Sequence, residues 1–471
     1  MTGMDTKPFS SNLLKQNGIL AWIVCLGMLF SNMIIQGINC SFGEIMPSII
    51  TEFDSDLATV SLIPSIHAFF YYISGYVCSI LVKWYSFRTL AFIGGLSSCI
   101  AFLASFSSSS IVSLTLSYGL FGGLGNGIVY IPGLIACGFY FDEHKRALAT
   151  GLATSGNGIG VILIPIFMSC INDEFGWRSA MLFLSVISPI ICLFSLVMIP
   201  LSVLSTDIPE NSTMENIASL ENGDGNNNDL ASEKEKLLNK HQGQSPNSAS
   251  SYPITPGLLQ QIHDYVIESW NLLKQPKLIF YCISHGLLTV GYFIPIDFLN
   301  SMMVMEHQIS DEFARYIIPI IGISNFAGNL FTGLLMFKYK VSPIFLHALY
   351  CVGCGFSCLT FTFCTNYYDF VAVAVFYGFC VGPITMLIME CLTKMFGISL
   401  VKDTVGFIML VYAMGSIIGA PIGGYISDIG QSFNAAFYFA AILYILAALN
   451  GWATLHLNRK CEKRNQGYIQ I

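Results

Sequence analysis

The chain has 471 residues, of which 54% are hydrophobic and only 10% are charged, and its mean hydropathy is +0.65. A soluble globular fold needs more polar material than this to cover its surface, so the composition excludes one. The formal net charge is -7, and no basic block is interleaved with aromatic residues, which excludes a nucleic-acid partner. The composition therefore predicts a protein whose surroundings are the lipid bilayer.

Long apolar segments recur along the whole chain. A membrane-spanning helix needs about 20 mostly apolar residues to cross the hydrocarbon core. The spans expected before the central polar stretch are 19–41, 59–82, 89–107, 111–139, 147–170 and 179–203. Those expected after it are 277–300, 314–337, 343–364, 368–391, 403–427 and 433–456. The sequence thus predicts an all-α membrane protein with twelve transmembrane helices.

The polar stretch divides these spans into two groups of six. Its run "ENGDGNNNDLASEKEK" has too little apolar surface to fold, which predicts disorder, whereas "GLLQQIHDYVIESWNLLKQ" near its end predicts a helix on the inner membrane surface. The expected segments are an N-terminal tail at 1–18, a six-helix bundle at 19–203, a mostly disordered linker at 204–276, a second bundle at 277–456 and a C-terminal tail at 457–471.

The basic residues predict the orientation of the chain. With both termini in the cytoplasm, every one of the 21 Lys and Arg residues except Arg178 and Arg315 lies on the cytoplasmic side. Short loops show the bias most clearly, because Lys145 and Arg146 lie on one side and Asp173 on the other. We therefore expect the tails and the linker to be cytoplasmic.

An internal repeat relates the two groups of spans. The second span reads "IPSIHAFFYYISGYVCSILVKWYS" and the eighth reads "IPIIGISNFAGNLFTGLLMFKYKV", with the same interval between proline and lysine in each. The pair Tyr118-Gly119 likewise matches Tyr377-Gly378. Two pseudo-symmetric six-helix bundles related by an axis along the membrane normal are typical of transporters with a site between the halves.

Several stretches carry a family resemblance. They are "YGLFGGLGNGIVYIPG" in the fourth span, "ALATGLATSGNGIG" from Ala147 after the basic pair Lys145-Arg146, "FGWR" at Phe175 to Arg178, and "GAPIGGYISD" in the eleventh span. Together they resemble the major facilitator superfamily and, within it, the monocarboxylate transporters (solute carrier family 16). The resemblance implies alternating-access transport of a small organic solute, namely a monocarboxylate or related carboxyl-bearing metabolite, across the plasma membrane. It implies no cofactor, and for some relatives it implies a single-pass glycoprotein chaperone as partner.

The chain departs from that family at three charged positions. Cys40, Asn325 and Asn329 stand where the resemblance to proton-coupled members implies a lysine, an aspartate and an arginine. Their replacement weakens proton-linked lactate transport. The alternatives are a proton-independent facilitator of aromatic amino acids or of a neutral solute, and a non-transporting sensor with the same fold.

Neutral amides are the main candidates for contacting a solute, because no Lys or Arg lies in the middle of a span. The amides predicted to bind substrate are Asn32, Gln36, Asn39, Asn157, Asn325 and Asn329. On the first span they recur at intervals of four and three residues, so they share one helix face. For each amide, the alternative is an interhelical hydrogen bond that stabilises the bundle.

Ionisable groups inside spans form the second set of candidates. His67, Tyr71 and His285 are predicted to contact the substrate or a proton, with a hydrogen-bonded packing role as the alternative for each histidine. The predicted gating residues are Glu390, Asp297 and Arg315. We expect Glu390 to pair with Lys394 or another cytoplasmic base, with proton carriage as the alternative, whereas Asp297 and Arg315 lie at the outer ends of their spans. Solvated rim charges are the alternative for Asp297 and Arg315.

Glycines repeat every four residues in three of the spans. Such small-residue faces let helix backbones approach closely and slide, which predicts rocking interfaces. The predicted helix-interface positions are Gly123, Gly127, Gly156, Gly160, Gly415 and Gly419. The sequence contains no HExxH motif and no nucleophile elbow, and its 15 cysteines stand singly in apolar runs, so neither an enzyme nor a metal site is expected.

Overall fold

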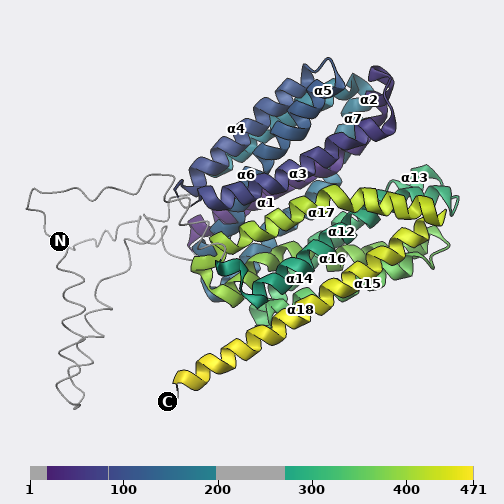
Figure 1. Cartoon of the computed structure of the whole chain (residues 1–471). Coiled ribbons are helices and arrows are strands. Elements are labelled where there is room, and N and C mark those ends of the chain that lie inside the picture. The colour runs from purple at the N-terminus through teal and green to yellow at the C-terminus, as the bar shows by residue number, and fades with distance from the viewer. Residues whose placement is uncertain (1–17, 83, 198–270, 470–471) are drawn as a thin grey trace, which may run out of the picture. The chain divides into compact units, whose positions relative to one another are not determined.

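The computed structural model describes residues 18–82, 84–197 and 271–469, and every regular element in them is helical (Figure 1). Both predicted halves belong to one compact unit. The predicted N-terminal tail, most of the linker and the predicted surface helix lie outside the described residues.

The described residues of the first half form nine helical elements, which make up six spans and the short helix α2. The elements are α1 (Ile19–Ser41), η1 (Phe42–Glu44), α2 (Met46–Phe53), α3 (Leu57–Leu81), α4 (Phe87–Phe106), α5 (Ile111–Leu114), η2 (Thr115–Gly122), α6 (Gly123–Tyr140) and α7 (Glu143–Val197). Because α5, η2 and α6 follow one another without a break, they form a single span from Ile111 to Tyr140. Its central segment η2 is a π-helix.

The second half has the same number of spans. Its elements are α12 (Pro276–Met305), α13 (Asp311–Ala314), α14 (Ile317–Tyr339), α15 (Pro343–Phe361), α16 (Tyr367–Phe396), η4 (Ile398–Leu400), α17 (Val401–Gly430) and α18 (Phe433–Ile469). The last helix continues beyond the predicted span end at 456, so the described part of the predicted C-terminal tail is helical. Its final turns extend past the neighbouring helices (Figure 1).

The spans predicted from hydropathy are present. Among the described residues, 11 helices are long and apolar enough to cross a membrane, and α7 counts once although it has 55 residues. The chain turns within α7 at Gly176, where φ is 81° and ψ is 164°. A side chain is strained at that positive φ, so glycine permits the turn that separates the fifth span from the sixth. The expectation of twelve transmembrane helices is therefore confirmed.

Local signals explain where the helices begin. Asp56 caps α3 by accepting a hydrogen bond from the Thr59 backbone N–H at 3.2 Å, and Ser86 caps α4 through the Thr89 N–H at 3.1 Å. Both side chains satisfy a donor that the first helical turn leaves open. Asn366 closes a reciprocal capping box at the start of α16.

Many apolar side chains point away from the protein. On α4, Ile93, Leu96, Ile100 and Leu103 are all exposed, at spacings of three and four residues. An apolar stripe of this kind is unfavourable against water and favourable against lipid acyl chains. The exposed face of α4 therefore marks the lipid-facing side of the bundle.

The contacts between the halves follow the repeat. The second span, α3, packs against the eleventh, α17, and the eighth span, α14, packs against the fifth, in α7. Exchanging the two halves turns the first pair into the second, as a pseudo-two-fold axis requires. The matched glycines support this, because Gly119 packs on the Ile63 carbonyl of α3 and Gly378 on the Ile321 carbonyl of α14.

Candidate functional site: a cavity between the halves

A cavity of about 840 Å³, including its open mouth, lies between the two halves. Its walls come from α1, α3 and α7 of the first half and from α12, α14, α16 and α17 of the second. The lining residues are Gln36, Cys40, Tyr72, Asn157, Val161, Leu288, Thr289, Tyr292, Ile296, Ile318, Ile321, Gly322, Asn325, Val381, Ile384, Thr385 and Tyr412.

The cavity reaches one end of the bundle. We call the end at which α1 begins and α7 ends the linker end, and the opposite end the far end. Cys40 is the last residue but one of α1, and Ile318 is the second residue of α14, so both lining residues lie at the far end. The polar contacts between the halves lie at the other side, from the middle of the bundle to the linker end.

The chemistry of the lining is neutral and rich in donors. Amides, phenols, hydroxyls and a thiol alternate with aliphatic side chains, and none of the described lining residues is Lys, Arg, Asp or Glu. Three tyrosines, Tyr72, Tyr292 and Tyr412, bring aromatic surface as well as hydroxyl groups. Such a lining can hydrogen-bond a polar group of a solute and enclose an apolar part.

Half of the predicted amides line this cavity. Gln36, Asn157 and Asn325 do so, from three different helices. Asn32 is instead buried between α1 and α7, where its Nδ2 donates to the Ala153 carbonyl at 2.9 Å. The Asn39 Oδ1 atom is buried without a hydrogen-bond partner and does not belong to the lining.

Asn329 lies behind Asn325 and connects the halves. Its Nδ2 donates to Asn325 Oδ1 at 2.9 Å, and its Oδ1 accepts from Thr154 Oγ1 of α7 at 3.1 Å. Asn329 is fully buried. This chain of bonds joins α7 to α14 on the linker side of the cavity, where it holds the halves together.

His67 is part of the packing of the first half. Its Nδ1 donates to the Tyr118 carbonyl at 2.9 Å, and Asn126 Nδ2 lies 3.4 Å from its Nε2. Tyr71 is also buried and does not line the cavity, whereas its neighbour Tyr72 does. The alternative of a hydrogen-bonded packing histidine thus describes the geometry of His67.

His285 lies one layer behind the cavity wall. Its Nδ1 is 2.8 Å from the hydroxyl of Tyr412, which lines the cavity. Its ring stacks on His347 at 4.7 Å between centroids. His285 therefore reaches the cavity through a phenol and does not line it.

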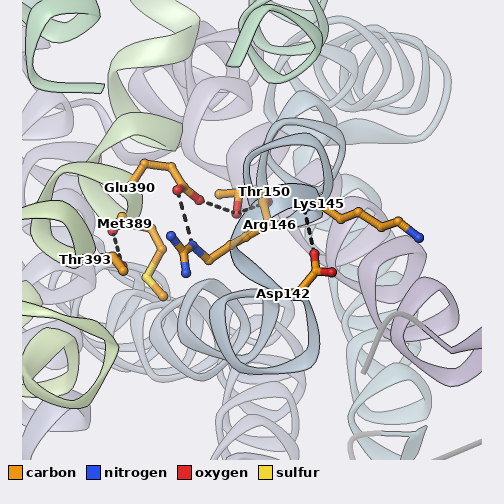
Figure 2. A network of polar contacts seen from close by, with 7 residues as sticks. All are labelled: Asp142, Lys145, Arg146, Thr150, Met389, Glu390 and Thr393. Carbon is orange, nitrogen blue, oxygen red and sulfur yellow. Dashed lines mark hydrogen bonds and ion pairs between the residues drawn. The ribbon is translucent and has the colours of Figure 1, made fainter. Parts of the chain in front are cut away.

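A buried ion pair joins the halves at the linker end (Figure 2). Arg146 Nε of α7 is 3.2 Å from Glu390 Oε2 of α16, and Thr150 Oγ1 donates to Glu390 Oε1 at 3.3 Å. Only 12% of the Arg146 side chain and 4% of the Glu390 side chain are exposed. Figure 2 shows the Lys145 ammonium group pointing away from the pair, although Lys145 precedes Arg146 in the chain.

The other predicted gating residues lie apart from this pair. Lys394 bonds Glu462 at 3.5 Å, and both side chains are about half exposed. Asp297 and Arg315 are exposed as well. Glu390 therefore has Arg146 as its basic partner and not Lys394.

The far end has an ion pair within the first half. Glu52 of α2 accepts from Arg178 and from Trp177 Nε1, the latter at 2.5 Å. Hydrogen bonds from Arg178 and Trp177 lower the pKa of the Glu52 carboxyl. Arg178 also donates to the Ser108 carbonyl at 3.0 Å, so it ties α2 to α7 and to the segment that follows α4.

The predicted interface glycines pack helices within each half. Gly123 and Gly127 of α6 face the backbone of α3, Gly156 and Gly160 of α7 face α1, and Gly415 and Gly419 of α17 face α12. Other glycines form the crossing between the halves. A Cβ on Gly322 of α14 would lie 2.8 Å from the Gly158 carbonyl of α7, and one on Gly151 would lie 2.9 Å from the Asn329 carbonyl.

Sequence reasoning missed Tyr412, Thr289 and Thr385 as cavity residues and Arg146 as the partner of Glu390. The three hydroxyl residues have no local pattern that separates them from lipid-facing or packing residues. Arg146 did have a signal, because an arginine at the end of a predicted span requires a partner or water.

Comparisons with known proteins agree with this architecture. The profile of the Major Facilitator Superfamily matches residues 20–402 and again 352–470. Monocarboxylate transporter 3 of Gallus gallus is 26% identical over 92% of this chain and 78% of its own length. Monocarboxylate transporter 7 of Homo sapiens is 21% identical over 95% and 87%, respectively.

Two solved transporters share the fold. The proton:xylose symporter XylE bound to 6-bromo-6-deoxy-D-glucose superposes with a TM-score of 0.65 at 12% identity, covering 92% of this chain and 95% of that one. FucP in the outward conformation superposes with a TM-score of 0.58 at 14% identity, covering 93% and 98%. This multi-pass helical membrane protein has a cavity between two repeated halves and is matched over most of its length by the family profile. It belongs to the Major Facilitator Superfamily and is a transmembrane transporter of small organic solutes.

Proposed function

We propose that the solute is a monocarboxylate or a related carboxyl-bearing metabolite, carried without chemical change by alternating access. The observation that carries this proposal is the neutral cavity, rich in hydrogen-bond donors, between the halves. The curated relatives named monocarboxylate transporters support the solute class and favour it over the amino-acid, neutral-solute and sensor alternatives. The transporter identity of the relatives also supports a carrier that is not an enzyme.

The cavity can stabilise a carboxylate without a fixed cation. An anion that leaves water loses several kcal/mol of solvation unless donors replace it. Gln36, Asn157 and Asn325 offer amide N–H groups, and the tyrosines offer phenolic O–H groups. Charge-assisted hydrogen bonds of this kind are about twice as strong as neutral ones.

Transport requires the linker end to open. In the described conformation the Arg146–Glu390 pair and the Thr154–Asn329 hydrogen bond join the halves there. We infer that these contacts close the gate while the cavity faces the far end, and that they separate when the halves rock. The Gly151 and Gly158 positions of α7 let it pass close to α14, which supports sliding at this crossing.

The cellular setting is part of the same proposal. The distribution of Lys and Arg in the sequence supports cytoplasmic termini and a cytoplasmic linker at 204–276 between bundles at 19–203 and 277–456. The far end would then face the outside of the plasma membrane. A single-pass glycoprotein chaperone is proposed as a partner because the family resemblance implies one for some relatives.

Uptake into proteoliposomes tests the proposal. Purified protein should admit radiolabelled lactate or phenylpyruvate faster than protein-free vesicles and should be inhibited by excess unlabelled substrate. Measurements with and without an inward proton gradient report coupling, and a radiolabelled aromatic amino acid is the comparison solute. Entry of the amino acid with no entry of either carboxylate would refute the proposed solute class.

A further inference from the structure

A histidine pair is buried behind the cavity wall, in the second half. His285 of α12 and His347 of α15 stack at an interplanar angle of 29°, and both are 0% exposed. Each has one ring nitrogen with a hydrogen-bond partner and one without: Nε2 of His285 and Nδ1 of His347 are buried and unpartnered. The pattern of filled and unfilled nitrogens fixes where the ring hydrogens lie.

The hydrogen of His347 follows from Ser284. The Ser284 hydroxyl donates to the Ala447 carbonyl at 2.7 Å, so its oxygen can only accept from His347 Nε2, which lies 3.0 Å away. His347 therefore carries its hydrogen on Nε2. Nδ1 of His347 is then unprotonated, so the buried atom without a partner is a hydrogen-bond acceptor and not an N–H donor.

The same reasoning assigns His285. A buried N–H without an acceptor is rarer and costlier than an unfilled acceptor, so the hydrogen does not sit on the unpartnered Nε2. It sits on Nδ1 and donates to the Tyr412 hydroxyl oxygen at 2.8 Å.

The consequence concerns the hydrogen of Tyr412. Because His285 already supplies a donor to the phenol oxygen, the Tyr412 O–H must find a different acceptor. His285 is its only hydrogen-bond partner in the part of the chain that the structure describes. The ring lines the cavity and is braced across the halves by an edge contact with Tyr72 at 5.3 Å between centroids.

We propose that Tyr412 donates its hydroxyl hydrogen to the carboxylate of the solute, and that His285 is a positioning residue that keeps this phenol a donor. The inference rests on the proposed function, because it assigns a site to the carboxylate. Because none of the described lining residues is a cation, Tyr412 is the group that we assign to the anionic carboxylate. A phenol that also accepts from an imidazole N–H is a stronger donor, because successive hydrogen bonds polarise one another.

The first test is the KM for lactate of Tyr412→Phe in proteoliposomes, with phenylpyruvate as a second probe. Loss of a hydrogen bond to a charged group should raise KM about tenfold, with little change in maximal rate. Tyr350→Phe is the matched control, because it removes another buried phenol of the second half that bonds Thr332 at 2.6 Å away from the cavity lining. The KM of Tyr350→Phe for lactate should stay within about twofold of the wild-type value.

A second series separates positioning from packing. His285→Leu should reproduce the KM rise of Tyr412→Phe, whereas His285→Asn, which keeps an amide N–H near the Nδ1 position, should recover most of it. The double variant Tyr412→Phe/His285→Leu should have a KM no higher than Tyr412→Phe alone, since both changes remove one interaction. Additive effects would mean that His285 acts through packing.

The outcomes distinguish the two proposals. If the wild-type protein transports neither carboxylate, the proposed function fails and the inference fails with it. If the wild type transports lactate and Tyr412→Phe has an unchanged KM, the inference alone is overturned. Melting temperatures of the purified variants identify misfolding. If Tyr412→Phe is misfolded, a lower KM in His285→Asn than in His285→Leu supports the inference, and equal KM values in the two variants overturn it.

Discussion

The ion pair between Arg146 and Glu390 should set the balance between the two conformations of the carrier. Glu390→Gln keeps the shape of the side chain and removes its charge. It leaves Arg146, which is only 12% exposed, without a counter-charge in the conformation described here. We expect the variant to shift the population toward the state in which the linker end is open.

The size of this shift follows from the burial of the pair. Breaking a fully buried ion pair by removing one partner costs about 3–5 kcal/mol. Arg146 lies at the end of the bundle and Thr150 still offers a hydroxyl group. We therefore expect Glu390→Gln to destabilise the closed state by about 2–3 kcal/mol. Because the charge is exposed to water once the end opens, this cost falls on one conformation. The open-to-closed ratio should rise about 30- to 150-fold.

Distances between spin labels at the linker end measure this ratio. Glu143 of α7 and Lys394 of α16 are both exposed and lie in different halves, so labels there report the opening. Glu390→Gln should move the distance distribution to longer values and lower the rate of net uptake. The exchanged pair Arg146→Glu/Glu390→Arg should restore much of the original distribution. An unchanged distribution in Glu390→Gln would refute the assignment of this pair as the gate.

Three further outcomes are expected. Gly158→Val places a side chain against the backbone of α14 and should reduce uptake at least about tenfold at normal surface expression. Gly43→Val is the control, because a Cβ at Gly43 meets nothing within 4 Å, and it should leave uptake unchanged. Equal uptake in the two variants would contradict sliding at this crossing. Because Arg178 lowers the pKa of Glu52, the pair stabilises the fold above the usual glutamate pKa of about 4.3, and the effect disappears as the pH falls through the lowered value. Glu52→Gln should therefore lower the melting temperature by up to about 2 °C at pH 7 and by less at pH 3, since the two side chains are 37% and 39% exposed and the pair contributes at most about 1 kcal/mol. An equal loss at both pH values would contradict this reasoning. Finally, a membrane-impermeant thiol reagent should modify Cys40 and block uptake when it is added on the far side, but not when it is added on the linker side. Uptake by the Cys40→Ser variant should be resistant to the reagent.

The sequence alone determined the membrane spans and their repetition. Apolar runs of about 20 residues can satisfy their backbone groups in lipid only as helices, so the prediction of spans does not depend on knowing which helices touch. The match between the second and eighth spans likewise predicted two related halves, and the pairing of α3 with α17 and of α14 with α7 agrees with it.

The sequence also identified part of the cavity wall. Gln36, Asn157 and Asn325 were expected as polar groups within spans, and all three line the cavity. Asn32 shares the face of Gln36 by spacing but donates to Ala153. Helical periodicity identifies residues on one face, and it cannot say which neighbour that face meets at each level of the bundle.

Only the tertiary structure decided the partners across the halves. Arg146 and Glu390 are separated by 244 positions in the chain, and their pairing depends on how α7 and α16 approach at one end of the bundle. Tyr412 became a cavity residue, and His285 its support, through the packing of α17 against α12. Hydropathy along a chain reports the preference of each segment for lipid, whereas a site between helices is set by contacts between segments that are distant in sequence.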